Sequence, residues 1–522
     1  MTWVLIALLV VPLVGALAVT FLRKDDAKAK LVALAFSVVE LVLAVLLWTA
    51  YKPSGDRIQL AFGVDWIPAF GVRLSFGIDG IALVMIAVIA LLIPLVIGAG
   101  WTEKLPAGRS QGGYLALILV QEAVTVAVFA ATDVFLFYVL FEVMLIPMYF
   151  LIGGYGGARR QYAAVKFFLY SFLGGLIMLA SAIGAYAMAS DELGKGTFDW
   201  ATLVKVVSDA DATTQTWLFL GFFLAFAIKA PLVPFHTWLP DAAAEAPIGV
   251  TVIVVGILDK VGTFGMLRYL LPMFPTASKN LAPLVLVLAV AGVLYGSLLA
   301  TGQRDMKRFL AYVSIAHFGF IALGIFSFTS QAGVGSVSYM LNHSISTGML
   351  ILVIGMVIAR GGSSQISDYG GMSKVAPLLA GMLLLSGLTT LSLPGTNSFV
   401  SEFLVLIGSF PTQPVATILA TVGMVLAALY VLWLYQRMMT GPLRGDALVG
   451  AASGPGAVGD PETKTTIGDL NKREIAVLAP LVVIVLALGF YPQPVLDVIT
   501  PTVGATLTEV GVTDPVSVQE GK

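Results

Sequence analysis

The segment that decides the fold is residues 215–246, which read QTWLFLGFFLAFAIKAPLVPFHTWLPDAAAEA. This segment is longer than the roughly 20 apolar residues that cross a hydrocarbon core as a helix. It places Lys229 deep in the apolar run, just before Pro231 and Pro234. Because proline removes a helical hydrogen bond and clashes with the preceding turn, the helix is predicted to break there. Irregular backbone at membrane depth is tolerated where it lines a watery cavity, so this segment indicates a transport protein.

Apolar stretches long enough to span a membrane recur along the whole chain. Of its 522 residues, 58% are hydrophobic and 11% are charged, whereas a soluble domain has about 25% charged residues. We therefore predict an all-α polytopic membrane protein with about 14 transmembrane helices. The predicted spans are 2–22, 31–51, 77–100, 114–131, 133–153, 163–189, 215–246, 248–272, 281–301, 309–328, 333–359, 376–408, 414–436 and 474–494.

Composition also limits the chemistry of the chain. The formal net charge of −1 gives no reason to expect a nucleic-acid partner. The absence of cysteine excludes disulfides, thiolate zinc sites and cysteine-ligated iron–sulfur clusters. The three histidines, His236, His317 and His343, lie far apart in the sequence, so a histidine-rich metal site is not expected. We predict no cofactor in this chain.

The distribution of basic residues predicts the orientation in the membrane. The positive cluster at 23–30 follows the first apolar run instead of preceding it, so we expect a retained first span with its N-terminus outside. With 14 crossings, nineteen of the 29 Lys and Arg residues fall on inside loops and seven on outside loops and the tail. Basic residues prefer the inside, so the pattern favours a multi-pass protein with both termini outside.

A second segment too long for one crossing is 376–408, which contains Pro394 and Gly395. Two broken helices that cross in opposite directions indicate inverted repeats. Residues 57–75 alternate apolar and polar side chains and predict a short external β-hairpin. The predicted organisation is N-terminal helices 1–3 with the hairpin over 1–113, a first five-helix repeat over 114–272, a second five-helix repeat over 281–436, a flexible cytoplasmic loop over 437–473, and a last helix with an external tail over 474–522.

Four charged residues lie far from the ends of the predicted spans: Glu142, Lys229, Lys260 and Glu402. A charge at mid-membrane costs roughly 2.5–3.5 kcal/mol on insertion scales, so each of them needs an explanation. One explanation is a structural ion pair that holds helices together, and the other is transport of protons or other cations. Lys229 flanks the first helix break and Glu402 follows the second, a related placement that favours transport.

The other charges in the spans have simpler interpretations. Arg268 is near the end of its span, and we expect its long side chain to reach the interface. Asp79 and Asp133 are expected to be interfacial as well. Glu40 and Glu122 are isolated acids for which a structural and a functional role both stay open.

His317 and His343 lie within spans of the second half, between Lys260 and Glu402 in sequence. A lone buried histidine is usually a satisfied structural residue, but histidine also exchanges a proton near neutral pH. We favour a relay role for both. The candidate site residues then form a proton wire in sequence order: Glu142, Lys229, Lys260, His317, His343 and Glu402.

Three segments resemble the signatures of the antiporter-like subunits of respiratory complex I, the NADH-quinone oxidoreductase. They are FEVMLIPMYF at 141–150, KAPLVPFHTWLPDA at 229–242 and DMKRFLAYVSIAH at 305–317. The resemblance covers nearly the whole chain, including the hairpin and the predicted spans. It implies a proton-translocating subunit whose redox chemistry lies in other subunits, so no flavin, iron–sulfur cluster or quinone site is expected in this chain.

The resemblance is not complete. The segment LPGTNSFVSEF at 393–403 places Glu402 where the related multisubunit sodium/proton antiporters typically carry lysine. Asp259 stands beside Lys260, where the family pattern leads us to expect an apolar residue, and the loop 441–473 is long. The glutamate favours a proton-pumping subunit of complex I over one alternative, a subunit of a sodium/proton antiporter, because lysine would be expected there. A third alternative, an inert membrane scaffold whose ion pairs only hold helices together, stays open.

The residues also suggest how such a subunit works. Burial disfavours the charged form of a lysine and a nearby carboxylate favours it. Lys229 can therefore hold a proton while paired with Glu142 and release it when the pair separates. The released proton would pass to Lys260 and then, by the two histidines and water, to Glu402. The implied partners are neighbouring antiporter-like and other membrane subunits of complex I, the lipid bilayer, protons and water, with the bacterial inner (plasma) membrane as location.

Overall fold

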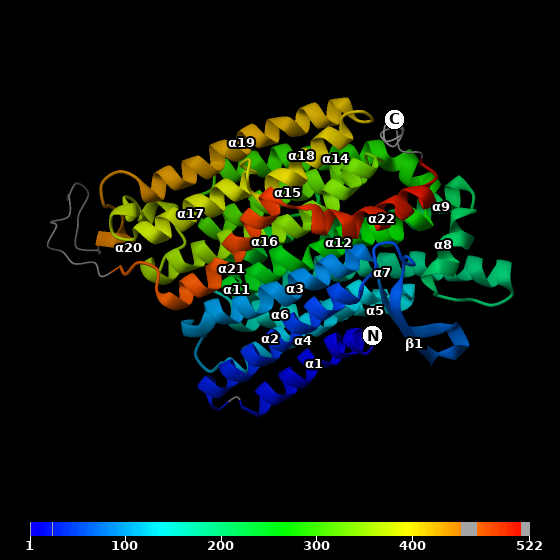
Figure 1. Cartoon of the computed structure of the whole chain (residues 1–522), viewed down its shortest axis with the longest axis horizontal. Coiled ribbons are helices and arrows are strands. Elements are labelled where there is room, and N and C mark those ends of the chain that lie inside the picture. The colour runs from blue at the N-terminus through cyan, green and yellow to red at the C-terminus, as the bar shows by residue number, and fades with distance from the viewer. Residues whose placement is uncertain (1, 23, 450–466, 513–522) are drawn as a thin grey trace.

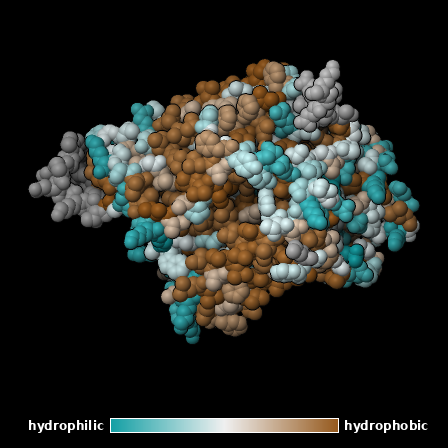
Figure 2. Space-filling view, in the orientation of Figure 1, coloured by the Kyte–Doolittle hydropathy of each residue, from teal (hydrophilic) through white to brown (hydrophobic). Residues whose placement is uncertain are grey.

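The computed structural model describes residues 2–22, 24–449 and 467–512 as a bundle of long helices. In Figure 1 most of these helices run along one common direction, which is horizontal in that view. Figure 2 shows hydrophobic residues over the middle of the visible face and hydrophilic residues gathered towards the two ends of the helices. This is the distribution expected of a protein that crosses a membrane with apolar helix sides against lipid.

The predicted membrane fold is confirmed. In the described part of the chain, 13 helices are long and apolar enough to cross a membrane, and each overlaps a predicted span. The division of these helices into two five-helix repeats stays a prediction. The helices are Thr2–Phe21 (α1), Asp26–Ala50 (α2), Gly80–Ala99 (α3), Gln111–Ala130 (α4), Val134–Val143 with Leu145–Tyr155 (α5 and α6), Arg160–Leu193 (α7), Ala212–Lys229 (α9), Ile248–Ile253 with Lys260–Gly265 and Leu271–Met273 (α11, α12 and α13), Pro275–Thr301 (α14), Met306–Ile325 (α15), Ser330–Gly361 (α16), Pro414–Met439 (α19) and Lys472–Phe490 (α21).

Both predicted helix breaks are present. The first follows the end of α9 at Lys229, and helical geometry resumes at Trp238–Glu245 (α10). The second divides the remaining predicted span, 376–408, into two shorter helices, Pro377–Thr390 (α17) and Asn397–Ser409 (α18). In each case the prolines named above lie between the two helical pieces, where they cannot support a continuous hydrogen-bond ladder.

The predicted hairpin consists of two antiparallel strands, Gln59–Ile67 (β1) and Val72–Ile78 (β2). The 3₁₀ turn Pro68–Phe70 joins them and ends at Gly71, whose φ of 61° lies in the left-handed region that favours glycine. Figure 1 shows the hairpin projecting from the same end of the bundle as the N-terminus. The two features therefore lie on one side of the membrane, as the predicted topology requires.

The C-terminal part of the chain differs from the prediction. The sequence predicts one last span and a tail, but Gln493–Val510 forms a further helix (α22) that packs against α3 and α16. Its Thr502 hydroxyl accepts a hydrogen bond from the Gly80 N–H at 3.0 Å, and Glu509 pairs with Arg57 just before β1. These partners lie far away in sequence, so α22 is stabilised by tertiary contacts that its mixed composition does not reveal. Two short helices also lie outside the predicted spans, Trp200–Ser208 (α8) and Asp446–Val449 (α20), and residues 450–466 of the predicted flexible loop lie outside the described residues.

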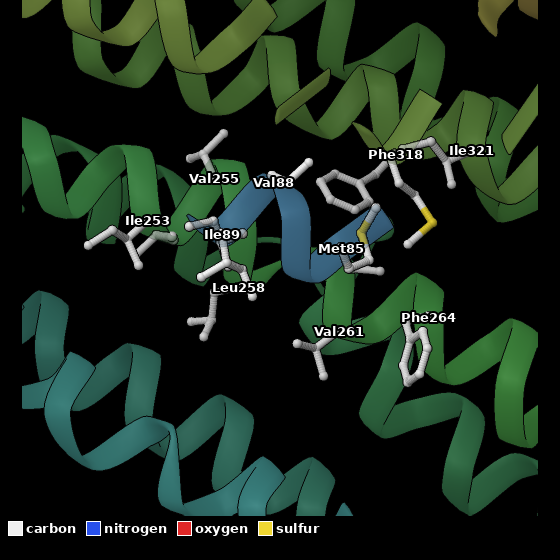
Figure 3. Packing of buried hydrophobic residues seen from close by; sticks show 14 of the residues in the cluster. Met85, Val88, Ile89, Ile253, Val255, Leu258, Val261, Phe264, Phe318 and Ile321 are labelled. Carbon is white, nitrogen blue, oxygen red and sulfur yellow. The ribbon is translucent and has the colours of Figure 1, made fainter. Parts of the chain in front are cut away.

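The centre of the bundle is apolar. Figure 3 shows Met85 and Ile89 of α3 close to Leu258 and Val261 of the helix that carries Lys260, with Phe318 of α15 beside them. All five side chains are buried. Lys260, on the same helix, is therefore buried beside apolar side chains, and an unpaired charge in such surroundings is costly.

Arg268 does not reach the interface, and that prediction is wrong. Its side chain is fully buried and forms an ion pair with Asp79, which is equally buried at the N-terminus of α3. The guanidinium carbon also lies 4.6 Å from the ring centroid of Trp200. The carboxylate of Asp79, 189 residues earlier in the sequence, thus stabilises the Arg268 charge in place of solvent. Asp133 is buried as well. It caps α5 in the predicted turn and accepts from the Leu136 N–H at 2.9 Å.

The last crossing helix touches the second helix break. Gly489, near the end of α21, lies so close to the carbonyl of Gly395 that a Cβ atom on Gly489 would overlap it. At its other end α21 carries Glu474, which pairs with Arg360 of α16 at 2.7 Å between Nη2 and Oε2. Contacts to other parts of the chain therefore hold α21 at both ends.

Candidate functional site

Lys229 is fully buried at the end of α9, and its Nζ has no hydrogen-bond partner among the described residues. The ammonium nitrogen lies over two aromatic rings, 5.1 Å from the centroid of Phe141 and 5.3 Å from that of Phe167. Such cation–π contacts stabilise a cation by about 0.5–2 kcal/mol, which only partly offsets the loss of hydration. The pocket of Lys229 therefore tolerates a charge without holding it strongly.

Glu142, on α5, is the acid whose charge acts most strongly on Lys229. Both of its carboxyl oxygens are buried, and neither has a hydrogen-bond partner within the described structure. The two residues are thus in electrostatic reach of each other but are not bonded. Gly175 of α7 leaves the space for the carboxyl group, because a Cβ atom at that position would overlap it. The arrangement is that of a separated pair.

The helix that carries Glu142 is interrupted two residues later, at Met144 between α5 and α6. The sequence predicts an unbroken span over 133–153, so this break is a correction. Pro147 explains it, because a proline in the first turn of α6 cannot donate a hydrogen bond to the carbonyl of Val143. The backbone beside Glu142 is therefore less constrained than a regular helix.

Lys260 follows a π-helical turn, Val254–Leu258 (η3). In this turn the Asp259 N–H donates to the Val254 carbonyl, five residues back, at 3.2 Å. The Lys260 side chain folds along the same turn, and its Nζ donates to the Val255 carbonyl at 2.6 Å. A second π turn, Met266–Leu270 (η4), follows α12. π turns are rare and occur frequently at functional sites, so the helix is irregular on both sides of Lys260.

Lys260 and His343 are in direct contact. Lys260 Nζ lies 2.6 Å from His343 Nδ1, and both residues are buried. On the other side of the imidazole ring, Nε2 lies 3.1 Å from the hydroxyl oxygen of Ser314. The ring of His317 packs edge-on against His343, with 5.2 Å between centroids. Both predicted histidines therefore lie beside Lys260.

Glu402, on α18, lies at the far end of this group. Its Oε2 accepts a hydrogen bond from the hydroxyl of Tyr339 at 2.9 Å and another from Ser392. The ring of Tyr339 lies 5.7 Å from that of His317, centroid to centroid. Tyr339 thus connects the histidines to Glu402. The sequence analysis does not find it, since a tyrosine in an apolar helix has no distinctive signal.

The backbone at the second helix break is held in an unusual conformation. Ser392 has a φ of 65°, in the left-handed region that costs a residue other than glycine about 1–3 kcal/mol. Beyond the break, Asn397 donates to Asn342 Oδ1 at 3.0 Å and accepts from Ser346 at 2.9 Å. These contacts fix the start of α18 on α16. They hold Ser392 where its hydroxyl can reach Glu402.

The structure thus brings four of the six predicted residues into one chain of contacts: Lys260, His343 and His317, with Tyr339 between the histidines and Glu402. Glu142 and Lys229 form a second group that is not bonded to the first. Asp259 directly precedes Lys260 and is fully buried. The predicted order of the two histidines is reversed, because Lys260 contacts His343 and His317 lies between His343 and Tyr339. The relay itself stays a prediction.

Glu40 and Glu122 form a separate pair of buried acids on α2 and α4. All four of their carboxyl oxygens are buried and lack hydrogen-bond partners in the described structure. The two helices pack against each other, so the two acids lie in neighbouring elements. Neither acid contacts the groups above, so the open question of their role is not decided by the geometry. Within the described ranges no cluster of three or more His, Cys, Asp or Glu side chains is placed to hold a metal ion.

These observations define the class: a polytopic helical membrane protein with two broken helices and a line of buried ionisable side chains between them. Residues 131–428 match the family described as NADH:quinone oxidoreductase/Mrp antiporter, TM. The chain is 46% identical to NADH-quinone oxidoreductase subunit M of Mycobacterium tuberculosis, over 97% of this chain and 94% of that protein. It is 38% identical to subunit M of Rhodobacter capsulatus, over 92% and 90% of the two chains. The chain belongs to the family of NADH-quinone oxidoreductase subunit M.

Solved structures agree with this assignment. A chain of respiratory complex I from Thermus thermophilus with bound NADH has 29% identity and a TM-score of 0.83, over 97% of this chain and 100% of that chain. A chain of the Mrp complex from a Dietzia species has a TM-score of 0.82 at 22% identity, over 98% and 100% of the two chains, and this likeness concerns the fold alone. The resemblance to the antiporter-like subunits of complex I that the sequence indicates is confirmed.

Proposed function

We propose that this chain is a proton-translocating membrane subunit of an NADH-quinone oxidoreductase, driven by redox chemistry in other subunits. The observation that carries the proposal is the buried chain of contacts from Lys260 through His343, His317 and Tyr339 to Glu402. Each of these side chains can donate or accept a proton, and each is buried. The chain itself acts as a translocase and holds no redox cofactor.

The separated pair of Glu142 and Lys229 supplies the switch. When the carboxylate approaches the ammonium, the charged form of Lys229 is favoured, and when they separate the proton is released towards Lys260. Moving one charge against 100 mV costs about 2.3 kcal/mol. A hydrogen bond to a charged group is worth about 1.5–3 kcal/mol. The free energy of making or breaking one such contact per cycle is therefore similar to the free energy needed to move one proton.

The test compares Glu142→Gln and Lys229→Ala in the intact complex, in membrane vesicles without added sodium. Gln keeps the shape of Glu but cannot ionise, so assembly should be normal while proton pumping per NADH oxidised falls by most of its value. Because both residues act on one switch, the double variant should be little worse than either single variant. Glu122→Gln is the matched control, because the carboxyl oxygens of Glu122 are likewise buried without a hydrogen-bond partner in the described structure, and the residue lies outside the chain of contacts. Normal pumping in all three variants would favour the scaffold, and pumping that requires sodium would favour the sodium/proton antiporter.

We further propose that both chain termini lie outside in the bacterial inner membrane. The chain contains no cysteine, so single introduced cysteines report the topology without background. Ser54 precedes the hairpin and Thr440 follows α19, and both are exposed. A membrane-impermeant thiol reagent should label Ser54→Cys in intact cells and Thr440→Cys only in inverted vesicles. The reverse pattern would invert the topology.

A further inference from the structure

Asp259 is a buried carboxyl group that the proposed switch and relay do not use. Its side chain has no exposed surface, and neither of its two oxygens has a hydrogen-bond partner among the described residues. Burying an acid without a hydrogen-bond partner costs folding free energy, and it contributes no structural contact in return. This combination in the centre of a membrane protein points to a group that changes its bonding during function.

The packing of α12 directs Asp259 towards Lys229. Asp259 and Gly262 are three residues apart and lie on one face of the helix. A Cβ atom on Gly262 would lie 2.6 Å from both the Ala230 N and the Phe226 O atoms, so this face touches the end of α9 next to Lys229. Glycine is required here because the two backbones approach each other so closely. Asp259 therefore faces the helix end that carries Lys229.

The neighbouring side chain points elsewhere. Lys260 directs its Nζ to His343 on α16 and to the Val255 carbonyl. Adjacent residues of a helix point about 100° apart, which accounts for the two directions. Asp259 and Lys260 thus occupy one short segment between two π turns, with the acid towards Lys229 and the amine towards the histidines. The charges of both lysines act on the Asp259 carboxyl group.

We propose that Asp259 carries the proton between Lys229 and Lys260, which deepens the proposed function and rests on it. The Asp259 carboxylate accepts a proton from the Lys229 ammonium, which leaves a carboxylic acid and a neutral amine. The acid then gives this proton to the neutral amine of Lys260, and the carboxylate is restored. The Lys260 ammonium next passes a proton to His343. No charge is created or lost, and no other reactant is needed.

The rival role for Asp259 is that of a fixed negative charge that only offsets the two lysines. A fixed charge keeps one protonation state through turnover, whereas a carrier is protonated and deprotonated once per cycle. The two roles therefore differ in the infrared signal of the carboxyl group. A proton carrier changes this signal during turnover, whereas a purely electrostatic or structural role leaves it unchanged.

The experiment uses the intact complex in vesicles with Asp259→Asn, Asp259→Glu, Lys229→Ala and the control Glu122→Gln. Asp259→Asn should assemble normally, and its rate of proton pumping should fall about tenfold or more. Asp259→Glu should keep most of the pumping rate. Turnover-induced infrared difference spectra should contain a carboxyl band that is absent in Asp259→Asn and shifted in Asp259→Glu. Glu122→Gln should leave both pumping and this band unchanged.

Three results would overturn the proposal. If Asp259→Asn pumps normally while Lys229→Ala does not, Asp259 carries no proton but the proposed function of the chain stands. If both variants pump normally, the proposed function fails together with the role of Asp259. If Asp259→Asn loses pumping but the carboxyl band persists, the residue is a fixed charge. Should Asp259→Asn fail to assemble, an unshifted band in Asp259→Glu is the result that rejects the carrier role.

Discussion

Lys260 Nζ lies 2.6 Å from Nδ1 of His343, a residue on a different helix and 83 positions later in the sequence. An ammonium group has only donors, so in this contact the nitrogen of the imidazole accepts when the lysine is charged. The other ring nitrogen then carries the hydrogen and faces the hydroxyl of Ser314. A proton that leaves Lys260 through this contact protonates Nδ1 of the ring, and Nε2 can then release its own proton.

The first prediction concerns His343→Leu. This variant keeps a similar volume but removes both ring nitrogens, so Lys260 loses its only side-chain acceptor among the described residues. We expect normal amounts of assembled complex and a loss of most proton pumping in vesicles. His343→Gln keeps one acceptor and one donor and should retain more activity than Leu. Equal pumping in Leu, Gln and the natural protein would show that the proton does not pass this ring.

The second prediction concerns Tyr339→Phe. The change removes only the hydroxyl that donates to Glu402 and keeps the ring contact with His317. We expect pumping to fall while the complex stays assembled, because the link between the histidines and Glu402 is interrupted. Tyr430→Phe is the matched control, since the Tyr430 hydroxyl is also buried but has no partner in the described structure. A larger loss in Tyr430→Phe than in Tyr339→Phe would contradict this path.

The third prediction concerns the buried ion pair of Arg268 and Asp79. Removing one partner leaves an unpaired buried charge, which typically costs 3–5 kcal/mol, roughly. Arg268→Met should therefore reduce the amount and the thermal stability of the assembled complex. Adding Asp79→Asn to Arg268→Met should restore part of the stability, because the uncompensated charge is gone while a capping oxygen remains. The comparison is made by thermal dissociation of the purified complex, and strictly additive losses would show that the two residues are not coupled.

The fourth prediction concerns Asp469, which lies outside the membrane-spanning segments. Burial alone would raise its pKa, but hydrogen bonds from the Leu378, Leu379 and Leu470 N–H groups, together with the charge of Arg360, bring the pKa below its usual value. A lowered pKa contributes stability above the unfolded pKa of aspartate, and this contribution is lost as pH falls through the folded value.

The N-terminal turn of α17 should accordingly open on acidification. Amide hydrogen exchange of Leu378 and Leu379, corrected for intrinsic rates, should accelerate below the usual pKa of aspartate in the natural protein. In Asp469→Ala it should be fast at every pH, because both capping bonds are absent. A corrected exchange rate that does not change with pH in the natural protein would contradict the prediction.

Much of the fold follows from local sequence. Apolar length predicts the crossing helices, and the prolines at 231 and 394 predict both major breaks, because each effect acts within a few residues. α22 is not predictable in this way. Its residues become helical against α3 and α16, and nothing within 493–510 reveals these partners.

The site is predictable only in part, for the same reason. A charge inside an apolar helix is conspicuous, so Glu142, Lys229, Lys260 and Glu402 are found from the sequence. The partner of each charge is not found, because it depends on tertiary contacts. The sequence alone predicts an interfacial Arg268, although its partner Asp79 is buried. The Tyr339 hydroxyl is identified only through its hydrogen bond to Glu402, 63 residues later.

The contact between Gly489 and Gly395 has a mechanical consequence. No side chain separates the two backbones, so the contact has no flexible atoms that could absorb a movement. If the irregular segment before α18 shifts, the end of α21 must therefore shift with it. The opposite end of α21 is tied to α16 through Glu474 and Arg360. α21 therefore links the turn that places Ser392 beside Glu402 to α16 at the opposite end of the helix, so we expect a displacement of one end to shift the other.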